Sequence, residues 1–165
     1  MPNRMLEEIK QTRPFTSPQQ EAALNVLRTA DALKRGVDLL LKRHGISSAQ
    51  YNVLRILRGA GARGMHCSGI AERLITAEPD ITRLLTRMEK LGLLVRRRDG
   101  GDRRVVTVTA TARGLQLLDK VELPLRELQK QQFALLNKDE LAGLISGLEK
   151  TRESIARGNA KRLQR

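Results

Sequence analysis

The chain has 165 residues and a formal net charge of +13, from 31 lysines and arginines against 18 acidic residues. This length is typical of one domain with a sizeable core, and so basic a surface favours a polyanionic partner such as DNA, RNA or an anionic membrane. Aromatic residues make up only 2%, which argues against the base-stacking platforms of proteins that bind RNA or single strands. Cys67 is the only cysteine, so an intrachain disulfide is excluded. No apolar run approaches the length of a membrane span, and we expect a cytoplasmic protein with no signal peptide and no membrane contact.

The N-terminal region predicts an arm followed by a long helix. Residues 1–16 indicate either a loose arm or a short extra helix, to which we assign no function. Ser17-Pro18-Gln19-Gln20 is typical of a helix start, with serine as the cap, proline in the first position and Gln20 reaching back. Apolar residues then recur at helical spacing up to Gly45, and we expect them to lie in the core. They are Ala23, Leu27, Ala30, Leu33, Val37, Leu40 and Leu41.

Two shorter helices are predicted next. Ser47 and Gln50 match a capping box, and the apolar positions that follow predict a helix that ends near Gly59. A glycine-rich connection leads to Met65-His66-Cys67. The run 68–74 then predicts a second short helix, whose apolar side is expected to pack beneath the helix after it. That side consists of Ile70, Ala71 and Leu74.

The stretch 76–92 predicts the helix around which the chain is organised. Thr76 is placed to cap its start, Pro79 is acceptable in the first turn, and Gly92 marks its end. One side is an apolar stripe of Ile81, Leu84, Leu85, Met88 and Leu91. The other side can donate hydrogen bonds and has few acids. It consists of Thr82, Arg83, Thr86, Arg87 and Lys90. The alternative is an ordinary amphipathic helix with a solvated charged side.

A hairpin is predicted after Gly92. The run through Arg96, Arg97 and Arg98 meets a Gly-Gly turn, and the β-branched run 105–109 returns after Arg103 and Arg104. Five arginines near one hairpin suit a strand laid along phosphates, with the tip in the minor groove, where the negative potential is strongest. Asp102 is placed to pair with Arg104. The alternative is a hairpin whose charges serve solubility alone.

Helix, turn, helix and hairpin in this order predict a winged helix-turn-helix, within a fold that is mainly α with a small β-wing. At these residues the sequence resembles the MarR family of bacterial regulators. The matching features are "ITRLLTRMEKLGLLVRR", the wing tip "DRR" at residues 102–104, and the exit "VTVTATARG" into a helix. The resemblance covers roughly residues 17–155. It implies that residues 65–67 form a short strand of the wing sheet, and that helices from both termini form a dimer.

Two further helices are predicted after the wing. Thr109 or Thr111 can cap the first, within which Pro124 should bend or break the helix. Asn137 opens the last helix in another capping pattern. The apolar stripe of the first consists of Leu115, Leu118, Val121, Leu125, Leu128 and Leu135 or Leu136. That of the second consists of Leu141, Leu144, Ile145, Leu148 and Ile155. Since a lone amphipathic helix is marginal in water, the simplest cover for these stripes is a second copy of the chain.

These patterns divide the chain into four parts: an arm (1–16), a helical dimerisation region (17–46 and 110–157), a winged helix-turn-helix (47–109) and a basic tail (158–165). We predict DNA contacts from the reader helix and the wing. Arg83 can pair with guanine, Arg103 and Arg104 would enter the minor groove, and Arg96, Arg97 and Arg98 would hold phosphates. The full set is Thr76, Thr82, Arg83, Thr86, Arg87, Arg96, Arg97, Arg98, Asp102, Arg103 and Arg104.

No catalytic or cofactor site is predicted. His44 and His66 have no metal-ligand spacing with each other or with Cys67, and "GAGARG" lacks the features of a phosphate loop. We therefore expect neither an enzyme nor a metal or cofactor protein. For Cys67, a small buried apolar role is favoured over a reactive thiol at a helix start.

The resemblance also implies a small aromatic or phenolic effector that binds between the dimer helices and the reading head and weakens DNA binding. Tyr51, Arg28, His44 and Arg55 could line such a cleft.

The sequence therefore predicts a homodimeric regulator of transcription, most often a repressor in this family, that binds double-stranded DNA at a pseudo-palindromic operator. Two alternatives stay open. One is an architectural protein that binds DNA with little regard to sequence. The other is an interaction adaptor whose winged helix no longer binds DNA.

Overall fold

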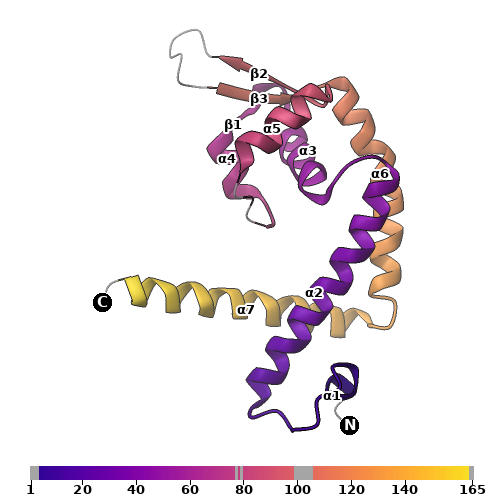
Figure 1. The fold of residues 1–165 in the computed structure, drawn as a ribbon, viewed down its shortest axis with the longest axis vertical. Coiled ribbons are helices and arrows are strands. Elements are labelled where there is room, and N and C mark those ends of the chain that lie inside the picture. The colour runs from indigo at the N-terminus through magenta and orange to yellow at the C-terminus, as the bar shows by residue number, and fades with distance from the viewer. Residues whose placement is uncertain (1–3, 77, 79, 99–105, 164–165) are drawn as a thin grey trace. The chain divides into compact units, whose positions relative to one another are not determined.

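The computed structural model (Figure 1) describes residues 4–76, 78, 80–98 and 106–163, apart from the side chains of residue 98 and of residues 160–163. The chain forms two compact units, Met1–Leu125 and Arg126–Arg165, and the boundary falls within α6. The elements are α1 (Arg4–Glu8), α2 (Pro18–Arg43), α3 (Ser48–Ala60), η1 (Gly61–Arg63), β1 (Met65–His66), α4 (Cys67–Arg73), α5 (Ile81–Lys90), β2 (Leu94–Arg98), β3 (Val106–Ala110), α6 (Ala112–Gln132) and α7 (Lys138–Leu163). The prediction of a mainly α fold with a small β-wing is confirmed.

The start of α2 lies where the sequence predicts it. Ser17 Oγ accepts a hydrogen bond from the backbone N–H of Gln20 at 3.2 Å, and Pro18 occupies the first turn, where its missing N–H removes no intrahelical bond. The return bond differs from the prediction. Gln20 Oε1 accepts from the backbone N–H and the hydroxyl of Thr16, at 2.8 and 2.9 Å, rather than from Ser17.

The apolar stripe of α2 is buried only toward its C-terminal end. Leu41 is fully buried, and Val37 and Leu40 pack against the core, whereas Leu27 is 66% exposed. The prediction that the whole stripe lies in the core is therefore wrong for the first half of the helix within one chain. With 26 residues the helix is about 39 Å long, and it extends beyond the elements that bury its C-terminal half.

The two short helices before α5 provide the base of the reading head. The capping box of α3 is complete: the Gln50 N–H donates to Ser47 Oγ at 3.2 Å, and the Ser47 N–H donates to Gln50 Oε1 at 2.8 Å. In α4, Ile70 is fully buried but Ala71 is exposed, so the predicted packing of Ala71 is wrong. One residue turns a helix by about 100°, which carries Ala71 from the core side to solvent.

The sheet has three antiparallel strands in the order β1-β3-β2, and the predicted pairing of the two hairpin strands is confirmed. The predicted Gly-Gly turn between them lies outside the described residues. Arg97 pairs with Thr107 across the hairpin, and Val108 at the centre is fully buried. Cys67 begins α4 and does not extend β1 as expected. Gly64, with φ of 65°, lies so close to β3 that an added Cβ would be 2.5 Å from the Val108 carbonyl oxygen. This contact requires glycine just before the strand.

The wing is joined to α6 by Thr111, one of the two caps that the sequence allowed. Its hydroxyl donates to the Gly92 carbonyl oxygen at 2.6 Å and accepts from the Gly114 N–H at 3.0 Å. Thr111 therefore ties the start of α6 to the turn that ends α5.

Pro124 was predicted to bend or break the helix. A break does not occur, because α6 is continuous from Ala112 to Gln132. Proline inside a helix costs about 3 kcal/mol. Leu118 and Val121, within the two turns before the proline, are fully buried, and burial of such side chains contributes roughly 1.5–3 kcal/mol each. Packing is thus large enough to keep the helix continuous.

In the second unit, α7 begins at the predicted cap. Asn137 Oδ1 accepts from the backbone N–H groups of Asp139 and Glu140, at 2.9 and 3.0 Å, and the Asn137 N–H donates to Glu140 Oε2 at 2.8 Å. The helix continues to Leu163, through most of the segment expected to be a basic tail. Of its apolar side chains, Leu144, Ile145 and Ile155 are exposed, Ile145 to 51%, whereas Leu141 and Leu148 are half-buried.

Most of the buried apolar residues form one core in the first unit, to which α2, α3, α4, α5, β2, β3 and α6 all contribute. Leu85 and Met88 of α5 are fully buried in this core, as are Leu54 of α3 and Leu94 of β2. None of the described helices combines the length and apolar character needed to cross a bilayer.

Candidate nucleic-acid interface

One side of α5 packs against the core. Leu84 is 2% exposed, and Leu85 and Met88 are fully buried, as predicted. Leu91 was expected to continue this stripe, but it is 46% exposed. The helix ends at Lys90 with Leu91 as its C-cap, and Gly92 follows in the left-handed region with φ of 69°.

The cap of α5 differs from the predicted one. The Asp80 carboxylate accepts a hydrogen bond from the Arg83 N–H at 2.9 Å, and the helix begins at Ile81. Thr76 is exposed in the preceding turn, so its prediction as the cap is wrong. Pro79 lies outside the described residues. Asp is among the best N-cap residues, and a negative charge at this end also suits the helix dipole, which favours Asp80.

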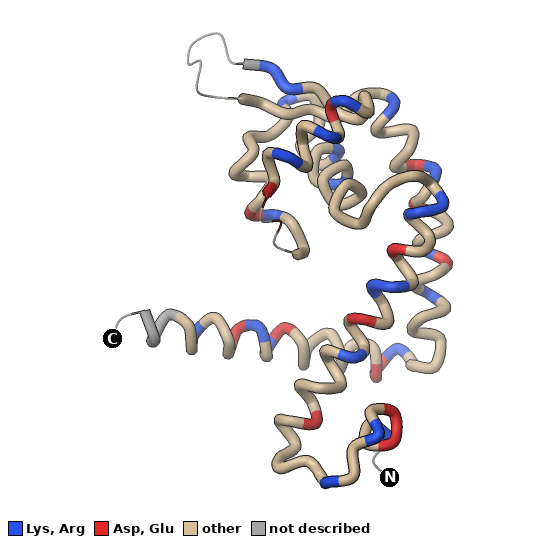
Figure 2. The backbone as a smooth tube through the Cα atoms, in the orientation of Figure 1, with Lys and Arg blue, Asp and Glu red and all other residues tan. Residues whose placement is uncertain are grey.

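The outer side of α5 carries the predicted donors. Thr82, Arg83, Arg87 and Lys90 are exposed, while Thr86 is half-buried. Figure 2 shows the basic residues recurring along this helix. Its one acidic residue is Glu89, next to the last residue of α5. The side chains available to a partner are therefore hydroxyls and cations, which suit base edges and phosphates.

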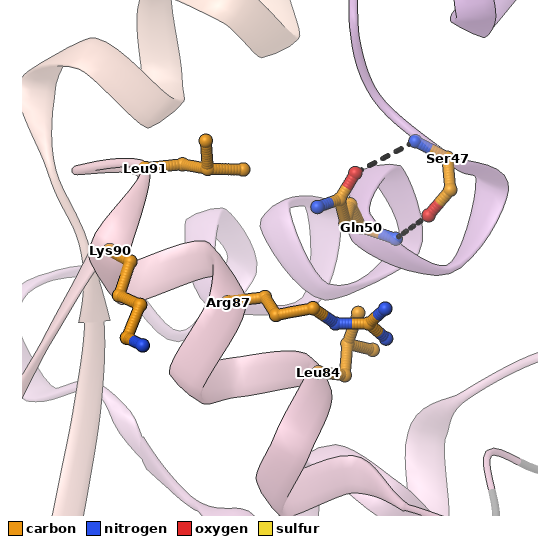
Figure 3. Close-up of a pocket in the computed structure, with 6 residues that line it drawn as sticks. All are labelled: Ser47, Gln50, Leu84, Arg87, Lys90 and Leu91. Carbon is orange, nitrogen blue, oxygen red and sulfur yellow. Dashed lines mark hydrogen bonds between the residues drawn. The ribbon is translucent and has the colours of Figure 1, made fainter.

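An open hollow of about 410 Å³ lies between the outer side of α5 and the first turn of α3. In Figure 3, the Arg87 side chain extends across it toward Ser47 and Gln50, whose two capping hydrogen bonds are drawn. Lys90 and the exposed Leu91 complete its wall together with Leu84. The hollow is part of the basic surface of α5.

The arginines of β2 lie on opposite faces of the strand, because successive side chains alternate. Arg97 is exposed, whereas Arg96 faces α5. For Arg98 only the backbone, at the end of β2, is described. The predicted wing-tip residues Asp102, Arg103 and Arg104 lie outside the described residues.

Glu89 is the site residue that the sequence did not reveal. Its Oε2 accepts from Arg96 Nε at 2.9 Å and Nη2 at 2.6 Å, and its Oε1 accepts from the Arg96 backbone N–H at 3.1 Å. Arg96 Nη2 also donates to Thr86 Oγ1 at 3.1 Å. The hydrogen bond from Arg96 holds the pKa of Glu89 below its ordinary value. The sequence signal that could have revealed Glu89 is that it is a lone acidic residue among the cations of the reader helix.

The residues suggested for an effector cleft lie at three places. On α3, the Arg55 guanidinium carbon is 5.9 Å from the centre of the Tyr51 ring, and burial raises the pKa of Tyr51. On α2, Arg28 lies 4.0 Å from Glu8 of α1. His44 lines a separate hollow of about 310 Å³ together with Arg113, Gln116 and Lys120, whose apolar wall includes Ile46, Leu91, Leu93 and Leu117.

Cys67 is half-buried at the start of α4 and packs against the core, consistent with the apolar role favoured for it. His66 lies beside it, with Nδ1 3.4 Å from the Val106 carbonyl oxygen. No group of three or more potential metal ligands occurs among the residues that the structure describes.

Comparison with known proteins gives a consistent result. The sequence profile described as "MarR family" matches residues 46–106. The homoprotocatechuate degradative operon repressor of Escherichia coli is 30% identical over 122 residues, which cover 74% of this chain and 79% of the repressor. The crystal structure of a MarR transcription factor from Planctomyces limnophilus is 42% identical, with a TM-score of 0.65, over 82% of this chain and 98% of that one.

Two more distant structures share the fold. One is the DNA complex of MepR from S. aureus, with a TM-score of 0.74 at 22% identity over 86% of this chain and 99% of that one. The other is the organohalide-sensing regulator RdhR-CbdbA1625 bound to 2,4-dichlorophenol, with a TM-score of 0.75 at 19% identity over 87% of each chain. Together with the hairpin and the capped α5, these likenesses show that the fold is that of a winged helix-turn-helix.

Proposed function

This chain belongs to the MarR family of transcriptional regulators, and on that premise we propose that it binds a specific operator as a homodimer and represses transcription. The observation that carries the proposal is α5 itself. The helix is seated on the core by three buried side chains, is capped by Asp80, and presents hydroxyls and cations to solvent. A helix held in this way can enter the major groove without rearrangement.

In this proposal Thr82, Arg83, Thr86 and Arg87 meet base edges and the flanking phosphates. Arg83 is the residue most suited to guanine, because its fork can donate to both N7 and O6, a pairing worth about 1–3 kcal/mol of discrimination. Thr76, which is exposed in the turn before α5, is proposed to meet the adjoining DNA backbone.

The wing supplies contacts that do not depend on sequence. Arg97 is exposed on the face of β2 opposite to Arg96, and is proposed to hold a phosphate together with Arg98. Arg103 and Arg104, positioned by Asp102, are proposed to enter the minor groove, where arginine suits the narrow negative channel.

Exposed apolar side chains on the helices support the homodimer. Leu27 of α2 is 66% exposed, Leu123 of α6 is 63% exposed, and Ile155 of α7 is 58% exposed. Leu135, after α6, is 97% exposed. A second copy would cover such surface, and its two reader helices would meet major grooves about one helical turn, or roughly 34 Å, apart.

We also propose that a small aromatic or phenolic effector releases the DNA. The 2,4-dichlorophenol complex of the distant RdhR-CbdbA1625 and the degradative-operon role named for the E. coli repressor support this class of ligand. Such a ligand acts only if it binds better to a dimer whose reader helices have the wrong spacing for the operator. No single site in this chain is assigned to it.

The net charge of +13 also favours an architectural protein that binds DNA with little regard to sequence. Two variants separate this function from operator binding. Arg83→Ala should reduce affinity for the operator by about tenfold while leaving random DNA nearly unchanged. Arg97→Ala should weaken both by similar factors and lower the salt dependence by about one counterion. Equal losses on both DNAs for both variants would favour the architectural protein.

A further inference from the structure

The side chains of Thr86, Glu89 and Arg96 form one connected network between the reader helix and the wing. Glu89 binds both the guanidinium and the backbone N–H of Arg96, through contacts of 2.6, 2.9 and 3.1 Å. Arg96 in turn donates to the Thr86 hydroxyl at 3.1 Å. The Thr86 hydroxyl donates to the Thr82 carbonyl oxygen one turn earlier, at 2.9 Å. The network therefore ends on the side of α5 that presents Thr82 and Thr86.

The chemistry of the partners fixes the direction of each hydrogen bond. A guanidinium has no acceptor, so Thr86 Oγ1 must accept from Arg96. A carbonyl oxygen has no donor, so the one hydroxyl proton of Thr86 must point to Thr82. A hydroxyl oxygen has two lone pairs, and one of them remains. In this arrangement the half-buried Thr86 can offer a DNA base an acceptor and no donor.

Arg96 is poorly placed to hold a phosphate. Its side chain is 25% exposed, its charge is paired with Glu89, and four of its N–H bonds, the backbone one included, are already donated. Its neighbour Arg97 is exposed on the other face of the strand. The two arginines therefore have different surroundings although they are adjacent in sequence.

We propose that Glu89 and Arg96 fix the hydroxyl of Thr86 as an acceptor, so that Thr86 selects a base with an exocyclic amino group in the major groove. Arg96 is then a positioning residue and not a phosphate contact. The inference rests on the proposed operator binding and specifies one position within each half-site.

The expected base follows from the groups in the major groove. Adenine presents its N6 amino group and cytosine its N4 amino group, and both can donate to the free lone pair of Thr86. At the same depth, guanine O6 and thymine O4 are acceptors, which leave two acceptors facing each other. Thr86 should therefore admit adenine or cytosine, and disfavour guanine and thymine, on the strand that it faces.

The first test uses the wild-type protein and an operator selected from a randomised library. One position per half-site should be restricted to adenine or cytosine. Replacing that base by purine or 2-pyrimidinone, which lack the amino group, should weaken wild-type binding by about tenfold and should hardly change the binding of Thr86→Val. If the base analogue weakens binding by the same factor in the wild type and in Thr86→Val, the proposal is overturned.

The second test concerns Arg96. Arg96→Met should relax the preference at this one position toward all four bases, and Arg96→Lys, which keeps a donor, should partly restore it. The matched control is Arg97→Met, which should weaken all sequences alike and reduce the salt slope by about one, while base preference is kept. A salt slope reduced equally by Arg96→Met would show that Arg96 binds phosphate and would overturn its positioning role.

These outcomes separate the two proposals. If no shared operator is recovered, the proposed function fails. If an operator is recovered but no position responds to Thr86→Val, only the inference about Thr86 fails. Should Arg96→Met melt at a much lower temperature, the base-analogue measurement on wild-type protein still decides the matter.

Discussion

The Asp80 carboxylate accepts a hydrogen bond from the backbone N–H of Arg83 at 2.9 Å, so the cap of the reader helix acts directly on the residue proposed to read guanine. Loss of an N-cap typically costs about 1 kcal/mol. Asp80→Ala should therefore lower the unfolding free energy by about this amount in a urea titration, and should weaken operator binding more than random-DNA binding. Asp80→Asn keeps the acceptor and serves as the control. Unchanged stability in Asp80→Ala would contradict the cap.

Gly114 lies against the turn between the reader helix and β2. An added Cβ would be 2.2 Å from the Leu93 carbonyl oxygen and 3.0 Å from Leu54 Cδ2. Gly114→Ala should therefore destabilise the protein by about 1–3 kcal/mol, as overpacking of a close contact does. Gly143→Ala is the matched control, because Gly143 lies inside α7 with nothing within 4 Å of the added Cβ. That change should stabilise by about 0.5–1 kcal/mol. Thermal melts of both variants check the contrast.

Acid should release the link between Glu89 and Arg96. The hydrogen bond from Arg96 lowers the pKa of Glu89, and hydrogen bonds from Lys34 and Ser48 lower that of Asp38. A carboxylate whose pKa is lower in the folded than in the unfolded state stabilises the fold. This stabilisation is fully present above the unfolded-state pKa values, near 4.5 and 3.8, and is lost as the pH falls through the folded-state pKa values. Unfolding free energy should thus be nearly flat from pH 7 to about 5 and fall below that. Glu89→Gln should make this fall in unfolding free energy shallower. If the dependence on pH below about 5 is the same in Glu89→Gln as in the wild type, the contribution of the Glu89–Arg96 pair to stability is refuted.

Sedimentation can test whether a second copy of the chain covers the exposed apolar surfaces of the helices. Leu27→Asp in α2 and Ile145→Asp in α7 place a charge on side chains that are 66% and 51% exposed in the single chain. Since exposed substitutions rarely affect folding, they should leave secondary structure intact but weaken dimerisation. The control is Ile75→Asp, in the turn before α5, where the side chain is 80% exposed. A dimer that survives both helix variants would count against these surfaces as the interface.

The sequence predicted most elements of the reading head because their signals are local. The Ser47–Gln50 capping box, the glycine after α5 and the β-branched return strand each depend on a few neighbouring residues. The buried side chains Leu84, Leu85 and Met88 follow from helical spacing alone.

The errors arise where several local choices compete or where tertiary packing decides. Thr76 and Asp80 are both good caps by residue type, and in the structure Asp80 is the cap. Pro124 is a strong local signal for a break, yet the buried Leu118 and Val121 keep α6 continuous. The pairing of Glu89 with Arg96 joins a helix to a strand across a turn, and no spacing rule for helices or strands predicts it.

The most direct test of operator binding is selection of genomic fragments by the purified protein at about 150 mM salt, where non-specific electrostatic attraction is largely screened. The account predicts that the sequenced fragments share an inverted repeat, with half-sites about one helical turn, or roughly 10 base pairs, apart. Fragments bound without any shared motif would contradict it and indicate an architectural protein, and no bound fragment at all would indicate an adaptor without DNA-binding activity.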